Sequence, residues 1–238
     1  MTRHDGRKAD ELRPIRFERR FTATAPGSVL ARCGETVVLC TASIVEGVPD
    51  WRLSSGAGWL TAEYEMLPGS TPDRRPRSRT RIDGRTQEIQ RLVGRSLRMA
   101  LDLSAVPAHT IYLDCDVLQA DGGTRTTAIN GAYVALCDAL AEGCRRGLWS
   151  IERPHAQIAA ISAGVVDGVA VVDLDYREDA AAEVDCNLVM NGVGEWIEVQ
   201  ATGERGTIPD SMLTELLALA RSGIQQVLEL QRSALSAD

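Results

Sequence analysis

The alternation of apolar and polar positions predicts strands in the first third of the chain. Residues 15–24, 28–33 and 36–46 alternate and are rich in Val, Thr and Phe, with turn signals at Pro26-Gly27 and Cys33-Gly34 between them. A fourth strand is predicted over residues 58–64. From residue 67 to residue 82 the periodicity is lost and Pro, Ser and Arg accumulate, which predicts a long exposed loop.

Helical spacing begins at about residue 86 and continues to residue 101. One face is apolar, and it carries Ile89, Leu92, Val93, Leu97 and Ala100. Another face carries Arg91, Arg95 and Arg98, which favours a solvated or interface face over a site. A buried strand is predicted over residues 110–117, and an apolar helix over residues 126–145, with a glycine-containing loop between them.

The second half of the chain repeats strands and then ends in a helix. Residues 158–166 and 169–174 flank Asp167-Gly168, which is a strong hairpin signal. A second hairpin is predicted from residues 183–190, a turn at Asn191-Gly192, and residues 196–201. Pro209 opens an amphipathic helix that extends to Leu230. We therefore predict an α+β fold with helices packed on mixed sheets, divided into residues 1–150 and 151–238.

Composition narrows the class of protein. The chain has 238 residues, 44% of them hydrophobic and 25% charged, which is typical of a globular protein that needs no disulfide or structural metal. No apolar stretch approaches the roughly 20 residues of a membrane span. The first 20 residues lack the apolar centre of a signal peptide, so we expect a cytoplasmic protein without a membrane partner.

Cysteine and histidine offer no obvious chemistry. The six cysteines show no CxxC spacing and fall within strand-like or helix-like runs, so buried thiols in a reducing compartment are expected. The three histidines have no metal-ligand spacing. Catalysis must therefore rest on other groups.

The charge distribution matters more than the net charge of −7. Among the 26 basic residues the only lysine is Lys8, and arginines cluster in a loop over residues 69–85. The cluster comprises Arg74, Arg75, Arg77, Arg79, Arg81 and Arg85. A solvated mobile loop and a phosphate-binding arm both fit this run, because guanidinium groups pair bidentately with phosphate oxygens.

The loop over residues 121–126 is the strongest candidate for an anion site. Gly122 and Gly123 allow a sharp turn and a close approach to a ligand, and the following helix presents unpaired N–H groups. Thr124 and Thr126 add hydroxyl donors. A plain N-capped turn is the alternative. Arg125, however, is unfavourable for the helix dipole in a first turn, and it suggests an anion that offsets it.

A second cluster is acidic and lies in the second half of the chain. It comprises Glu178, Asp179, Glu183 and Asp185, with Glu183 and Asp185 on one side of a strand. Such carboxylates are exposed to water, share a proton or bind a divalent cation. A solvated acidic turn is slightly favoured by spacing alone, whereas proximity to an anion loop would make the cluster a general acid and Mg²⁺ site.

Longer motifs resemble the ribonuclease PH family. They include His4-Asp5-Gly6-Arg7, residues 11–14, residues 58–64, and Met66-Leu67-Pro68. The most specific matches are the run over residues 84–98 and the run over residues 114–126, and residues 176–185 follow the same pattern. The resemblance covers nearly the whole chain.

The resemblance implies a fold of mixed sheets and packed helices in two βαβ-type halves. It also implies phosphorolysis, in which inorganic phosphate attacks the last phosphodiester of an RNA 3′ tail and releases a nucleoside diphosphate, mainly from tRNA precursors. Phosphate-binding positions of the family match Arg85, Gly123, Thr124, Arg125 and Thr126, and its acidic pair matches Asp179 and Asp185, with Mg²⁺ bound nearby. The implied assembly is a homohexamer built as a trimer of dimers, with Arg74, Arg75, Arg77, Arg79 and Arg81 around the RNA entrance.

Several positions depart from the family pattern. The loop from Gly69 to Gly84 is about two residues shorter, Glu65 replaces a small residue, and Asn130 replaces a threonine. Two other functions are alternatives for this sequence: a non-catalytic RNA-binding ring subunit and a two-metal hydrolytic nuclease. The first is disfavoured by the retained Arg85, Arg125, Asp179 and Asp185, and the second by the Gly-Thr-Arg loop, since attacking water needs no anion pocket.

Overall fold

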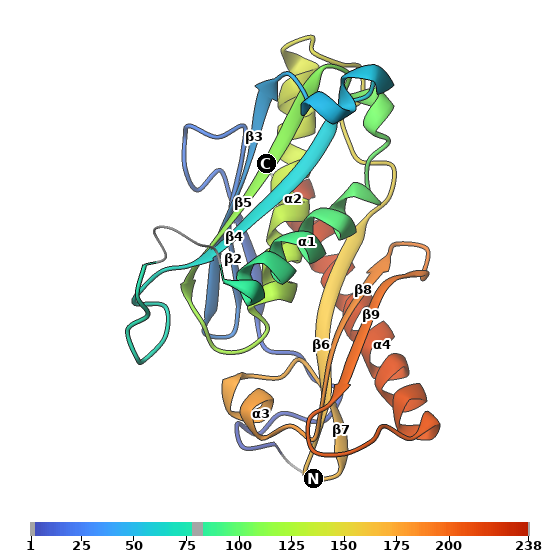
Figure 1. The fold of residues 1–238 in the computed structure, drawn as a ribbon. Coiled ribbons are helices and arrows are strands. Elements are labelled where there is room, and N and C mark those ends of the chain that lie inside the picture. Colours follow the sequence, from blue (N-terminus) through green and yellow to red (C-terminus); the bar gives the residue numbers. More distant parts are fainter. Residues whose placement is uncertain (1–2, 78–82, 238) are drawn as a thin grey trace.

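A computed structural model describes residues 3–77 and 83–237 of the chain. Two sheets and four α-helices make up the described part (Figure 1). The first sheet has the order β1-β2-β3-β5-β4, and the second has the order β7-β6-β8-β9. The predicted α+β class with helices on mixed sheets is confirmed.

The first sheet is formed by β1 (Ile15–Arg19), β2 (Gly27–Cys33), β3 (Thr36–Glu46), β4 (Trp59–Met66) and β5 (His109–Gln119). Its strands pair antiparallel except β4 and β5, which run parallel and are joined through α1 (Gly84–Arg98). This β4–α1–β5 segment is a βαβ unit of the expected kind. Two short 3-10 helices, Asp50–Ser55 and Leu103–Ala105, were not predicted.

The second sheet is formed by β6 (Ile158–Val166), β7 (Val169–Val172), β8 (Val184–Asn191) and β9 (Trp196–Gly203). All three of its pairings are antiparallel. Because β7 and β8 both pair antiparallel with β6, they run parallel to each other, and the short helix α3 (Tyr176–Ala181) connects them in a βαβ unit with β6 between its two strands. The predicted hairpin turn is confirmed, because Asp167 and Gly168 have φ values of 50° and 73°, as a two-residue hairpin turn requires. The β8–β9 loop is longer than a two-residue turn, and its positive φ lies at Gly194 instead of Gly192.

Helix α2 (Thr124–Arg145) lies between the two sheets and explains the apolar character of its sequence. It contacts β2 and β3 of the first sheet and β6 of the second, and most of its residues are buried. Gly27, the first residue of β2, lies directly against α2: a Cβ there would be 1.9 Å from the carbonyl oxygen of Ala135. This glycine is therefore required for packing, and the turn that we placed at Pro26-Gly27 lies in residues 20–26.

Helix α4 (Asp210–Ser236) covers the second sheet and extends beyond the predicted end at Leu230. Its buried side chains Leu216, Ala220, Ile224, Val227 and Leu228 pack on apolar residues of β6, β7 and β8. A short helix α3 (Tyr176–Ala181) separates β7 from β8 and lies near the N-terminal residues (Figure 1). No helix in the described ranges is long and apolar enough to cross a membrane.

Candidate active site

A cleft of about 620 Å³ brings the two sequence-predicted clusters together. Its walls come from the loop after β4, the start of α1, the β5–α2 loop, α3 and β8. Among the residues that line it are Arg85, Gly123, Thr124, Arg125, Asp179 and Asp185. These residues are up to 100 positions apart in sequence, and the fold places them on one cavity.

The β5–α2 loop presents an open helix end to this cleft. Gly122 and Gly123 both adopt positive φ, 72° and 64°, and Gly123 is the N-cap of α2 without a side-chain capping bond. The first hydrogen bond of the helix is donated by the backbone N–H of Thr127 to the carbonyl of Gly123. The N–H groups of Thr124, Arg125 and Thr126 come before it, so the helix itself offers them no acceptor. The plain N-capped turn is therefore not what forms, and the helix end favours an anion.

Arg125 projects from the first turn of α2 into the cleft, and it has an incomplete set of partners. Its Nη2 donates to Glu88 Oε2 on α1 at 3.0 Å. Its Nε is buried and makes no hydrogen bond to the described residues. A buried guanidinium N–H without an acceptor is uncommon, because its desolvation is not compensated, so this donor is available to a bound anion.

The two threonines of the loop have different environments. The hydroxyl of Tyr64, buried in β4, donates to Thr124 Oγ1 at 2.8 Å, which leaves the Thr124 proton available for a ligand in the cleft. The hydroxyl of Thr126 donates to the carbonyl of Gly123 at 3.0 Å, and Thr126 is buried outside the lining of the cleft. Its side chain therefore supports the loop, and only its backbone N–H faces the helix end.

Asp179 on α3 and Asp185 on β8 form the acidic side of the cleft. Partial burial raises the pKa of Asp179, and the charges of Arg85 and Arg125 oppose that rise. Burial raises the pKa of Asp185 to about 6, with a further contribution from Asp179, while Arg125 opposes it. Asn187 Nδ2 donates to Asp185 Oδ2 at 3.2 Å.

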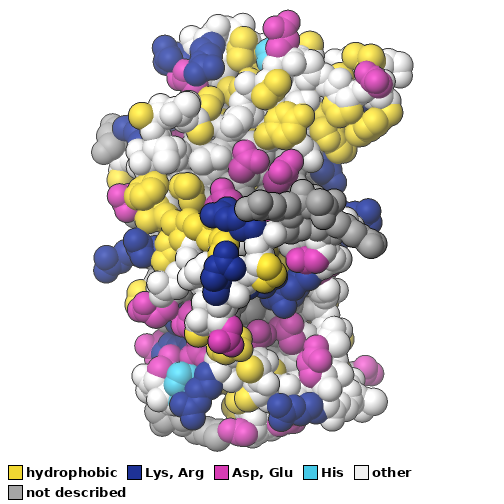
Figure 2. Space-filling model, turned by 60° about the vertical axis from the view of Figure 1, so that its left-hand side comes forward, with side chains coloured by type: hydrophobic (Ala, Val, Ile, Leu, Met, Phe, Trp, Pro, Cys, Tyr) yellow, Lys and Arg dark blue, Asp and Glu magenta, His cyan; other side chains and the backbone are white. Residues whose placement is uncertain are grey.

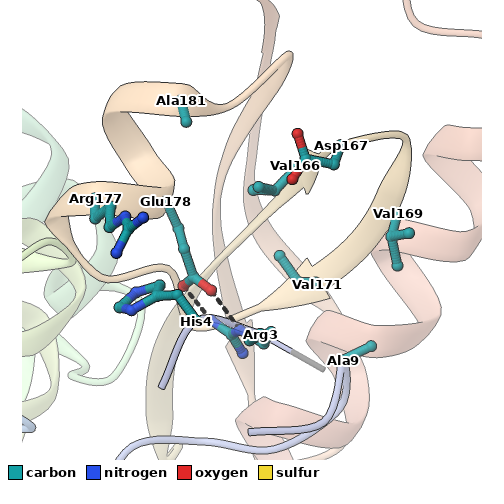
Figure 3. Close-up of a pocket in the computed structure, with 10 residues that line it drawn as sticks. All are labelled: Arg3, His4, Ala9, Val166, Asp167, Val169, Val171, Arg177, Glu178 and Ala181. Atoms are coloured by element: carbon teal, nitrogen blue, oxygen red, sulfur yellow. Dashed lines mark hydrogen bonds and ion pairs between the residues drawn. The ribbon is translucent and has the colours of Figure 1, made fainter. Parts of the chain in front are cut away.

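The other two predicted carboxylates lie outside the cleft. Glu183 Oε1 accepts from the backbone N–H of Gly168 in the β6–β7 turn. Glu178 is buried and bonded to Arg3 and Arg7, beside a separate pocket of about 230 Å³ (Figure 3). The predicted four-carboxylate cluster is therefore divided, and only Asp179 and Asp185 meet the anion loop.

Glu178 also belongs to the one group of potential metal ligands found among the described residues, with His4 and Asp175. Both oxygens of Glu178 already accept hydrogen bonds from Arg3 (Figure 3). His4 Nε2 lies 2.5 Å from Asp175 Oδ2. A cation there would have to displace a guanidinium group. This group is therefore a hydrogen-bonded cluster and not a metal site.

The arginine-rich loop contributes in part to the cleft. Arg75 lines it and lies 3.8 Å from Asp83, while Arg74 and Arg77 are exposed outside its lining. Arg79 and Arg81 lie outside the described residues. Several basic side chains lie at the middle height of this face of the molecule, where acidic side chains also occur, and further basic side chains lie near its top and its bottom (Figure 2).

Among the residues that line the cleft, sequence reasoning did not single out Ser162, Tyr176 or Asn187. Asn187 could have been found, because it lies two positions after Asp185 on the same face of a strand. Helix α3 could also have been found, since Asp175 and Glu178 form a capping box, each bonding the other's backbone N–H. Ser162 and Tyr176 carry no signal of this kind.

The fold and the cleft together define an α+β protein in which paired carboxylates face an open helix N-terminus. The model of the 3′ exoribonuclease family, domain 1, matches residues 11–142, and that of domain 2 matches residues 156–223. The chain belongs to this 3′ exoribonuclease family.

Relatives and solved structures agree with that assignment. The chain is 56% identical to ribonuclease PH of Mycobacterium sp. (strain KMS), covering 99% of this chain and 92% of the relative. It is 53% identical to ribonuclease PH of Acaryochloris marina, covering 98% of each. The resemblance to the ribonuclease PH family and the expected enzyme class, a phosphorolytic 3′ exoribonuclease, are thus confirmed.

Two solved structures share the fold at low sequence identity. Rice Rrp46 superposes with a TM-score of 0.79 at 20% identity, over 98% of this chain and 100% of that one. The Archaeoglobus fulgidus exosome with RNA bound to its active site gives a TM-score of 0.83 at 21% identity, over 95% and 91%. They confirm the expected fold.

Proposed function

We propose that the cleft binds inorganic phosphate at Arg85, Arg125 and the N-terminus of α2, and uses it to remove nucleotides from RNA 3′ ends. The observation that carries this proposal is the buried Nε of Arg125, which has no acceptor among the described residues and lies beside the uncapped helix end. The backbone N–H groups after Gly123 and the hydroxyl of Thr124 add donors. Two guanidinium groups and a helix end favour a small multivalent anion.

In the proposed reaction a phosphate oxygen attacks the phosphorus of the last phosphodiester, and the bond to the 3′-oxygen of the preceding nucleotide breaks. The leaving 3′-oxygen needs a proton. We assign its delivery to Asp185, because a pKa of about 6 keeps a useful fraction protonated near neutral pH. Burial is the main cause of this raised pKa, and the charge of Asp179 raises it further. The arginines neutralise the charge that develops on the phosphoryl oxygens.

Asp179 and Asp185 also fit a divalent cation. Mg²⁺ is commonly bound by one or two carboxylates, with waters and substrate phosphates completing its shell, and these two carboxylates both line the cleft. When bound there, Mg²⁺ would supply positive charge to phosphate oxygens.

We further propose tRNA precursors as substrates and a homohexameric ring, a trimer of dimers, as the assembly. Arg74, Arg75, Arg77, Arg79 and Arg81 would then contact the RNA backbone. The exosome relatives that share this fold support a ring. The free cysteines, five of them buried, support a reducing compartment and hence a cytoplasmic location. Light scattering should give six times the chain mass of 25.7 kDa.

One assay tests the reaction. The protein is incubated with a 3′-tailed tRNA and Mg²⁺, with and without inorganic phosphate, and the released nucleotides are separated. We expect nucleoside diphosphates only when phosphate is present. Monophosphates released without phosphate would indicate hydrolysis, and RNA binding with no release would indicate a non-catalytic subunit; either result would overturn the proposal.

A further inference from the structure

Three arginines of the N-terminal segment converge on the turn between β7 and α3. We call Arg3, Arg7 and Arg13, with their partners Asp173 and Glu178, the arginine latch. The side chains of all five are 8% exposed or less. None of the five lines the active-site cleft, yet Glu178 is next in sequence to Asp179.

Arg13 joins this turn to the phosphate loop. Its Nε and backbone N–H donate to Asp173 Oδ2 at 3.0 and 2.7 Å, and its Nη2 donates to Oδ1 at 2.7 Å. Its remaining Nη1 donates to the carbonyl of Asp121, directly before Gly122. Arg13 Nη2 also lies 3.1 Å from the position that a Cβ at Gly123 would occupy. The guanidinium therefore supports the back of the loop, away from the cleft.

Arg3 and Arg7 hold the start of α3. Arg3 forms a bidentate pair with Glu178, with Nε to Oε1 at 2.6 Å (Figure 3). It also donates to the carbonyls of Val172 and Asp173 at 2.8 Å. Arg7 donates to the Asp173 carbonyl at 2.9 Å and to Glu178 Oε2 at 3.3 Å. Glu178 in turn accepts the N–H of Asp175 and completes the capping box.

The backbone at the centre of the latch is strained. Asp173 has φ 56°, in the left-handed region, and it is 1% exposed. A non-glycine residue remains in such a conformation only where its surroundings overdetermine it. Here the carboxylate and the carbonyl of Asp173 both accept from the arginines, so the latch fixes the direction in which the chain enters α3.

We propose that the latch positions the two sides of the active site relative to each other. Arg13 sets the position of the phosphate loop, and Arg3, through Glu178, sets the position of α3 and thus of Asp179. This inference rests on the proposed function. It assigns a positioning role in the active site to three arginines that contact neither phosphate nor RNA. Displacing a binding loop by about 1 Å is enough to weaken catalysis strongly.

Two conservative variants separate the two sides. Arg13→Lys keeps the charge for Asp173 but loses the fork that also reaches Asp121, so we expect the phosphate KM to rise about tenfold with kcat within twofold. Arg3→Lys loses the bidentate pair with Glu178, so we expect kcat to fall about tenfold while phosphate affinity stays within twofold. Phosphate binding is also measured without RNA, by calorimetry.

The matched control is Arg19→Lys. Arg19 also pairs with an aspartate at two positions, Nη2 to Asp138 Oδ1 at 2.6 Å and Nε to both oxygens at 3.2 Å, but Asp138 lies in the middle of α2, away from the cleft. This variant should lose stability without any change in phosphate KM or kcat. Melting temperatures of the three variants are compared with their kinetic constants.

The outcomes distinguish the latch from a merely structural role. If Arg13→Lys bound phosphate as tightly as the wild type, or if all three variants lost activity only in proportion to their melting temperatures, the latch proposal would be wrong. A wild-type protein that binds phosphate but releases no nucleoside diphosphate would contradict the proposed reaction. Comparing phosphate binding by the wild type and by Arg13→Lys in the calorimeter would still test whether Arg13 positions the phosphate loop. A wild-type protein that binds no phosphate overturns both.

Discussion

Of the two carboxylates Asp179 and Asp185 in the cleft, Asp185 has the larger rise in pKa. Burial and the neighbouring Asp179 raise its pKa to about 6 from an ordinary 3.8, although Arg125 stabilises the ionised form. Spacing alone slightly favoured a solvated acidic turn, and the family resemblance predicted Asp185, with Asp179, as a candidate acid. It could not predict the pKa, because the pKa depends on Arg125 and on burial, both of which come from other parts of the chain.

The raised pKa of Asp185 predicts a pH-dependent stability. Above pH 6 the folded protein holds an ionised carboxylate that it disfavours, and this cost disappears as the pH falls from about 6 to about 4. Asp185→Asn should therefore be more stable than the wild type at pH 8, by about 1–2 kcal/mol, and equal to it near pH 4. Its kcat should fall sharply while RNA still binds.

Urea unfolding at pH 8, 6 and 4 measures this difference. Asp167→Asn is the control, because Asp167 lies in an exposed hairpin turn and asparagine also adopts its positive φ readily. A stability difference for Asp185→Asn that stayed constant across these pH values would contradict the raised pKa. Full retained activity would contradict the assignment of this residue as the acid.

Arg125 provides the second test at the residue scale. Arg125→Ala removes the unpartnered Nε and a charge, so the phosphate KM should rise about 10- to 100-fold, as expected for loss of hydrogen bonds to a charged ligand. Arg146→Ala, at the opposite end of α2 and 47% exposed, should leave it unchanged. Initial rates at varied phosphate and saturating RNA give both constants; an unchanged KM for Arg125→Ala would place phosphate elsewhere.

At the scale of elements, the strands and long helices were predictable and the connections were less so. Helices α1 and α2 and the β6–β7 hairpin follow from apolar spacing and turn residues. Predicted strand 15–24 ends at Arg19 because Arg20 adopts φ 58° and the chain leaves the sheet. Helix α3 was missed because only six residues form it, and a capping box and buried ion pairs stabilise it instead of an apolar face.

The contact between the phosphate loop and α3 yields a prediction about glycine. A Cβ at Gly122, φ 72°, would lie 2.5 Å from the backbone carbon of Asp175 and 2.6 Å from the Leu174 oxygen. Gly147 has nearly the same φ, 73°, with no atom within 4 Å of such a Cβ. Gly147→Ala should therefore cost only the backbone strain, about 1–2 kcal/mol, whereas Gly122→Ala should cost more.

Gly122→Ala should also raise the phosphate KM, because the loop can make room only by moving away from α3. Thermal unfolding of the two variants, with phosphate titrations, separates strain from displacement. Equal losses of stability in both variants, with unchanged phosphate affinity, would show that the loop does not depend on close contact with α3.

At the scale of the whole molecule, the sequence indicated the phosphate loop and the acidic cluster, but not that residues of both line the same cleft. The anion loop follows β5 of the first sheet, the acids lie on α3 and on β8 of the second sheet, and α2 packs between the two sheets. Asn130 on α2 bonds the backbone of Ala160 on β6 through both ends of its amide, at 2.8 and 2.9 Å. Such contacts fix how the sheets lie relative to each other, and local periodicity does not encode them.

The whole-molecule charge raises the question of how a chain with net charge −7 binds RNA. A few arginines near the cleft would be enough if they contact RNA phosphates. Each such contact to single-stranded RNA contributes about −0.7 to the slope of log affinity against log salt concentration. Replacing the exposed Arg74 and Arg77 together by alanine should therefore reduce that slope by about 1.4, with kcat at saturating RNA unchanged. Fluorescence anisotropy with a 3′-tailed RNA at several salt concentrations measures it.

The control is the pair Arg145→Ala and Arg146→Ala, which removes the same charge from the other end of α2. These arginines pair with Glu142, and the 22-residue helix puts them roughly 33 Å from its N-terminus at the cleft. If RNA responded only to net charge, both double variants would change affinity equally. A change in salt slope confined to Arg74 and Arg77 would show that the position of a few arginines, and not the sum of charges, brings an anionic substrate to an acidic protein.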